Sequence, residues 1–87
     1  MQFLHNDLGY LAAGQTIEVA LDVAANVKLM DGGNFNSYRN GRQHKYYGGY
    51  ATYSRTHITV PNAGHWHIAI DLAGRRGTIR SSVRVLD

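Results

Sequence analysis

The segment 64–72 constrains the fold most, because its residues alternate strictly between the two faces of an extended strand. One face carries Trp66, Ile68, Ile70 and Leu72, and the other carries His65, His67, Ala69 and Asp71. Trp66 is the only tryptophan in the chain. A buried aromatic side chain of that size removes about 150–250 Å² from water, so other strands must be built around it. The sequence therefore predicts a central strand with one buried face.

Three other segments also alternate between apolar and polar residues, and each predicts a strand. They are residues 15–22, residues 27–30 after a turn at 24–26, and residues 56–60. Turns are predicted at 31–34, which holds two glycines, and at 61–64, where a proline presets φ. At the N-terminus, residues 1–5 predict a short strand, and residues 8–11 predict a turn of helix that stops at Gly14.

The C-terminal residues 77–86 alternate as well, and they predict a hairpin with residues 64–72. The register that keeps the two faces apart pairs Leu72 with Ile79, Ile68 with Val83 and Trp66 with Val85. On the polar face it pairs Asp71 with Arg80 and His67 with Arg84. These patterns predict an all-β chain, a single domain over residues 1–87. We expect a small β-sandwich or flattened barrel of six to seven mostly antiparallel strands, with at most one short helical turn.

The composition narrows the class of protein. A chain of 87 residues can bury one modest core. The absence of cysteine excludes disulfides and a cysteine-based zinc site, and it predicts a reducing, cytoplasmic location. No segment approaches the about 18 apolar residues of a membrane span, and no export signal precedes the first strand, so we expect a soluble protein without a membrane partner. The net charge of +3 favours anionic partners, but it is far from that of dedicated nucleic-acid binders.

Residues 35–55 form the most distinctive segment, with five of the six tyrosines and four of the nine basic residues. We expect a loop followed by a hairpin at 46–51, in which Gly48-Gly49 forms the turn and Tyr47 faces Tyr50. Tyrosine and arginine together suit binding to bases, sugars or protein surfaces, although cross-strand tyrosine pairs also stabilise hairpins without a ligand. The candidate ligand-binding residues are Tyr38, Arg39, Arg42, Lys45, Tyr47, Tyr50 and Tyr53.

His65 and His67 form a second candidate site, because they lie on one strand face about 6.5–7 Å apart. That spacing is found in metal sites on sheets, but a third ligand is needed, from His57, from His44 or from an acid on a neighbouring strand. The alternative is a pair of half-exposed histidines packed on a polar sheet face. The sequence holds no phosphate-binding glycine motif and no known catalytic motif, so it predicts no cofactor and no enzyme.

Several segments together resemble a small bacterial family called domain of unknown function 1883. The most specific are Tyr46-Tyr47-Gly48-Gly49 and Gly64-His65-Trp66-His67, and others are Val27-Lys28-Leu29-Met30-Asp31, Asn34-Phe35, Tyr38-Arg39, Gly41-Arg42, Ile70-Asp71-Leu72 and Ser82-Val83-Arg84-Val85. Members of the family occur alone or ahead of a TIR signalling domain. The resemblance therefore implies a small β domain that works as a recognition or sensing module, and it implies no active-site residue.

The leading hypothesis is a non-enzymatic recognition module that binds an anionic or polar ligand, or a protein, through the tyrosines and arginines of residues 35–55. Three alternatives stay open. The first is single-stranded nucleic-acid binding, with bases stacked on tyrosines and phosphates held by Arg39, Arg42, Lys45 and Arg55. The second is a histidine-centred metallo-hydrolase. The third is a structural domain that forms homo-oligomers through an exposed sheet edge.

Overall fold

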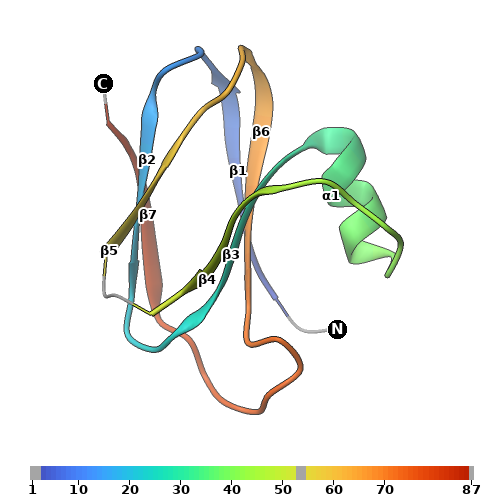
Figure 1. Cartoon of the computed structure of the whole chain (residues 1–87), viewed down its shortest axis with the longest axis vertical. Helices are drawn as coiled ribbons and strands as arrows, with labels where there is room; N and C mark the ends of the chain where they lie inside the picture. Colours follow the sequence, from blue (N-terminus) through green and yellow to red (C-terminus); the bar gives the residue numbers. More distant parts are fainter. Residues whose placement is uncertain (1–2, 53–54, 87) are drawn as a thin grey trace.

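The computed structural model describes residues 3–52 and 55–86, which form a two-layer β-sandwich with one helix on its outer side (Figure 1). One sheet has the strand order β1-β6-β3-β4 and the other has the order β5-β2-β7, and all pairings are antiparallel. The elements are β1 (Leu4–Leu11), β2 (Thr16–Leu21), β3 (Ala25–Asp31), α1 (Gly32–Arg39), β4 (Tyr47–Ala51), β5 (Arg55–Thr59), β6 (Gly64–Asp71) and β7 (Ser81–Leu86). The prediction of an all-β sandwich is confirmed.

The main core lies between the sheets, and β6 contributes its largest side chain. Trp66, Ile68 and Ile70 all point into this core, as the alternation predicts. The indole Nε1 of Trp66 donates a hydrogen bond to the carbonyl oxygen of Asn62, 2.9 Å away, so its one polar atom is satisfied. Since β6 lies between β1 and β3, the prediction of a central strand is confirmed.

The outer face of the four-stranded sheet is covered by α1, which Figure 1 shows on the side away from the other sheet. The carboxylate of Asp31 accepts a hydrogen bond from the backbone N–H of Asn34 and caps the helix. Phe35 and Tyr38 then bury their rings in a second cluster with Met30 and Ala69. We predicted a turn followed by a loop here, and that prediction is wrong. The eight-residue α1 is too short to cross a membrane, and the described part of the chain holds no longer helix.

The helical turn predicted at residues 8–11 is also wrong, because these residues belong to β1. This strand pairs with β6 from Leu4 opposite Ile70 to Leu11 opposite Gly64. A β-bulge between Asp7 and Gly9 shifts the register by one residue, and Gly9 takes a positive φ of 70°. The bulge breaks the two-residue period of the sequence, which is why a strand was not expected over these residues.

The predicted hairpin at 46–51 does not form, since Gly48 and Gly49 lie inside β4. They pair with Lys28 and Val27 of β3, and Tyr47 therefore does not face Tyr50. A Cβ atom on Gly48 would lie 2.4 Å from the carbonyl oxygen of Val27, and Gly48 has a φ of 113°. Position 48 requires glycine because two strands approach each other closely there, and not because the chain turns.

The predicted pairing of β6 with the C-terminal segment is wrong as well. Residues 72–80 cross from one sheet to the other along the bottom of Figure 1, and β7 pairs with β2. Val83 lies opposite Val19 and Val85 opposite Ile17, so the apolar face of β7 still packs on the main core. A strand with alternating apolar and polar residues can pair with any strand that has the same pattern. The pattern alone therefore does not determine its partner. Arg80 and Arg84 consequently lie away from Asp71 and His67.

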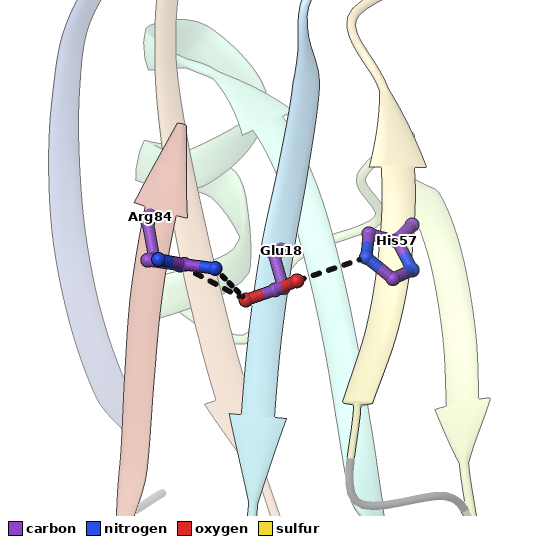
Figure 2. Close-up of polar contacts among 3 residues, drawn as sticks. All are labelled: Glu18, His57 and Arg84. Carbon is purple, nitrogen blue, oxygen red and sulfur yellow. Dashed lines mark hydrogen bonds and ion pairs between the residues drawn. The ribbon is translucent and has the colours of Figure 1, made fainter. Parts of the chain in front are cut away.

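Glu18 joins the three strands of the smaller sheet on its outer face (Figure 2). Its carboxylate accepts hydrogen bonds from Arg84 of β7, at 2.8 and 2.9 Å, and from His57 of β5, at 3.1 Å. The hydrogen bond from His57, followed by that from Arg84, lowers the pKa of Glu18 below its usual value of 4.5. The charged form of Glu18 is therefore stabilised in the folded state.

A Glu18→Gln variant should lower the melting temperature at about pH 7 and lose this effect in acid. Because the folded-state pKa lies below 4.5, the contribution of Glu18 is present above that value and disappears as the pH falls through the folded-state pKa. Thermal melts of both proteins between about pH 7 and pH 3 check this, and their melting temperatures should converge at the acid end. A difference that is constant across the range would contradict the assignment.

Candidate functional site

Tyr38 does not belong to an open binding face, because only 1% of its surface is exposed. It lies on α1 with its ring against Phe3 and Phe35, and its hydroxyl donates a hydrogen bond to a carboxylate oxygen of Asp71. Burial, followed by the hydrogen bond to Asp71, raises the pKa of Tyr38 well above its usual value of 10.0. The prediction that Tyr38 binds a ligand therefore fails, and its role is to close the space between α1 and β6.

Asp71 is a buried carboxylate at the end of β6, with 4% of its surface exposed. Burial on its own would raise its pKa, but hydrogen bonds from Tyr38, Asn26 and the backbone N–H of Ala73 outweigh that effect and lower the pKa of Asp71. Asp71 stays charged and fully hydrogen-bonded, so it fixes α1 and β3 to β6. The predicted hairpin placed Asp71 opposite Arg80, and the structure does not.

Three other tyrosines of this segment, Tyr46, Tyr47 and Tyr50, are exposed, but they point to separate places. Tyr46 lies over the ammonium group of Lys28, with 4.6 Å between Nζ and the ring centroid. Tyr47 packs edge-on against Trp66, and Tyr50 contacts Arg75. Tyr53 lies outside the described residues. These rings do not converge on one groove or form a continuous stacking surface.

Arg39, Arg42 and Lys45 are exposed at and after the C-terminal end of α1. Their backbone groups are fixed, since the N–H of Arg42 donates to Ser37 and the N–H of Lys45 donates to the side chain of Asn34. Their charged groups pair with no acid among the described residues. Among residues 3–52 and 55–86, no exposed tyrosine stacks against these three side chains.

A cavity of about 890 Å³ lies elsewhere, at the end of the sandwich where residues 72–80 cross between the sheets. Its apolar lining comes from Phe3, Leu4, Ile70, Leu72 and Ile79. The rest of the lining is Thr78, two glycines, Gly74 and Gly77, and two arginines, Arg75 and Arg76. A volume of this size is typical of sites for small organic ligands, and a mostly apolar wall with a few charged groups is their usual composition.

Arg75 is held in place at this cavity by uncharged partners. Its guanidinium donates to the carbonyl oxygens of Leu72 and Ala24 and to the hydroxyl of Tyr50, and it lies 5.6 Å from the Tyr50 ring centroid. Neither Arg75 nor Arg76 forms an ion pair with an acid among residues 3–52 and 55–86. The positive charge at the cavity is therefore not neutralised by the described part of the protein.

His65 and His67 do lie on one face of β6, and the register of β1 brings two more polar side chains to them. Asp7 is directly opposite His67, and its carboxylate oxygen is 2.6 Å from Nε2 of His65. Nε2 of His5 is 2.9 Å from Nδ1 of His67. Of the possible third partners, Asp7 is the one that lies beside these histidines, whereas His57 lies on the other sheet and His44 contacts Lys28.

The electrostatic states of this cluster follow from its contacts. The backbone N–H of Gly9, followed by His65, lowers the pKa of Asp7, so the carboxylate is charged at neutral pH. Partial burial lowers the pKa of His67, which keeps its imidazole neutral. The ring of Phe35 stacks on His5 and on His67, with centroids 4.0 and 4.9 Å apart, so α1 forms one wall of the cluster.

Sequence reasoning missed His5, Asp7, Arg75 and Arg76. His5 and Asp7 have the alternate spacing of one strand face, but a helical turn was expected immediately after them, and only the pairing of β1 with β6 joins them to His65. Arg75-Arg76 lies between the two segments predicted as strands, 64–72 and 77–86, and two adjacent arginines in a connection give no signal for a cavity. Finding the histidine cluster requires both a strand over residues 4–11 and its pairing with β6.

Replacing Tyr38 by Phe should destabilise the protein by about 1–3 kcal/mol, because it leaves the buried Asp71 carboxylate without one hydrogen bond. Urea unfolding at neutral pH measures this. The matched control is Tyr46→Phe, whose ring is 43% exposed, and it should change the stability by less than about 0.5 kcal/mol. Equal stabilities of the two variants would contradict a structural role for the Tyr38 hydroxyl.

Comparisons with known proteins identify the family of this chain. A family model described as a domain of unknown function, DUF1883, matches residues 1–87. No curated protein and no solved structure matches the chain. The match covers every element described above, including the β1–β6 pair that forms the histidine cluster and the crossing segment that forms the cavity. The chain therefore belongs to the DUF1883 family.

Proposed function

We propose that this protein is a non-enzymatic recognition module that binds an anionic amphiphile in the cavity at residues 72–80. By an anionic amphiphile we mean a small molecule with an apolar chain or ring and one carboxylate, sulfate or phosphate group. The observation that carries the proposal is an apolar cavity of about 890 Å³ bordered by two arginines that have no acidic partner among the described residues.

The apolar part of the ligand is assigned to the wall formed by the ends of both sheets. Leu72 follows the end of β6, Ile79 comes from the approach to β7, and Leu4 is 38% exposed at the start of β1. Covering such surface releases about 25 cal/mol for each Å² removed from water. An alkyl chain or an aromatic ring therefore gains free energy by entering the cavity.

The anionic part of the ligand is assigned to Arg75 and Arg76. Because Arg75 is already oriented by Tyr50 and by two carbonyl oxygens, it loses little conformational freedom when an anion binds. Arg76 forms no hydrogen bond with the described residues and supplies a second planar donor group. Two guanidinium groups match the geometry of a carboxylate or phosphate.

The lining also supports binding without a reaction. Among the described residues that line the cavity, Thr78 carries the one hydroxyl group, and none is an acid, a histidine or a lysine. A hydroxyl nucleophile requires a base within hydrogen-bond distance, and the lining offers none. The arrangement holds a ligand by charge and apolar contact, which is the function expected of a sensing module.

Decanoate is a suitable probe, because it is a ten-carbon chain that ends in one carboxylate. We expect isothermal titration to show one decanoate bound per chain, and NMR to show amide shifts centred on residues 72–79. Decyltrimethylammonium, which has the same chain length and the opposite charge, should bind at least about tenfold more weakly. An Arg76→Glu variant should weaken decanoate binding by a similar factor.

Arg39→Glu is the matched control, since it makes the same change of charge at an exposed position on α1, outside the cavity lining. It should leave the affinity for decanoate nearly unchanged. An equal loss of decanoate affinity in Arg76→Glu and Arg39→Glu would mean that the affinity depends only on net charge, and it would contradict the proposed site. Equal affinities for the anionic and the cationic probe would contradict the assigned ligand class.

A further inference from the structure

We propose that Asp7, His65 and His67 form a binding site for a divalent transition-metal ion of the zinc class, on the outer face of the β1–β6 pair. This site is separate from the cavity, since none of its residues lines the cavity. The three side chains can each direct one ligand atom to a common point, and these atoms all lie within 4.8 Å of one another. Donor atoms around a four-coordinate zinc ion lie about 3.3–3.5 Å apart, so small side-chain rotations complete the site.

The backbone, and not chance contact of mobile side chains, brings these groups together. Asp7 and His67 are directly opposite residues of an antiparallel pair, and His65 lies two residues from His67 on the same face. Asp7 is fixed further by the bulge, because its Oδ1 accepts the backbone N–H of Gly9 at 2.9 Å. The backbone therefore places the three side chains on one face of the sheet before any ion binds.

Two neighbours restrict the orientation of the His67 ring. Nε2 of His5 lies 2.9 Å from Nδ1 of His67, and the Phe35 ring stacks on both imidazoles. Groups that contact a ligand histidine help to fix its ring orientation. We assign this positioning role to His5 and Phe35.

The donor set selects the class of ion. Two imidazoles and one carboxylate suit zinc, copper(II) or nickel(II), and the chain has no cysteine that would favour softer ions. Magnesium and calcium prefer sites built mainly from oxygen ligands. Three protein ligands also leave at least one coordination position for water or an external ligand.

The test uses the full chain without a histidine tag, freed of metal by dialysis against a chelator. Isothermal titration with Zn²⁺ should show one ion bound per chain, and Co²⁺ should give the ligand-field absorption of a low-coordinate site. Zinc should also raise the melting temperature, because it binds only the folded state. Asp7→Asn keeps the acceptor for the Gly9 N–H and removes the charge, and it should weaken zinc binding at least about tenfold. His65→Gln should have a similar effect.

His57→Gln is the matched control, since it removes one exposed histidine from the other sheet and keeps a donor for Glu18. It should bind zinc as the unmodified protein does, and all three variants should remain folded in the absence of metal. Failure of the unmodified protein to bind Zn²⁺ in a saturable 1:1 ratio would overturn the proposal. An equal loss of zinc affinity in His57→Gln and His65→Gln would overturn it as well.

Discussion

The structure depends on one strand being covered on both faces. The inner face of β6 carries Trp66, Ile68 and Ile70 into the main core, and its outer face places Ala69 and Asp71 beneath α1. An antiparallel sheet in a small protein usually leaves one face to water. Here one helix of eight residues covers the second face around Ala69 and Asp71, and the buried carboxylate of Asp71 bonds that helix through Tyr38. Loss of this contact would leave a charged group buried without its partner.

The same strand positions both candidate sites. The first half of β6 passes beside β1 and places His65 and His67 next to Asp7, and its end passes beneath the crossing segment and places Ile70 at the cavity. Between these two points the strand is held on both sides by hydrogen-bonded neighbours. Each site thus rests on a rigid element, which lowers the entropy lost when a ligand binds. The two sites use different chemistry, one through nitrogen and oxygen ligands and the other through apolar surface and arginine.

Part of this architecture could be predicted from the sequence, because a strand with one buried face has a clear two-residue period. Residues 64–72 and 15–22 show that period, and the strands there were found. The bulge at Gly9 hides the period of β1, and α1 begins with two glycines that favour a turn. That helix is stabilised by a cap from Asp31 and by burial of Phe35 and Tyr38, which are tertiary effects. The partner of β7 could not be predicted, since its pattern fits either sheet.

The acidic side chains and the basic side chains have different partners in this fold. The chain has six acidic residues, and the five that the structure describes all accept hydrogen bonds from the protein itself, namely Asp7, Glu18, Asp22, Asp31 and Asp71. By contrast, Arg84 is the one lysine or arginine that pairs with an acid among the described residues. The acids thus cap a helix, stabilise a bulge and link neighbouring strands. Most basic side chains have no acidic partner among the described residues. Two of these unpaired basic side chains, Arg75 and Arg76, lie beside the apolar surface of the cavity, where charge and apolar contact are combined.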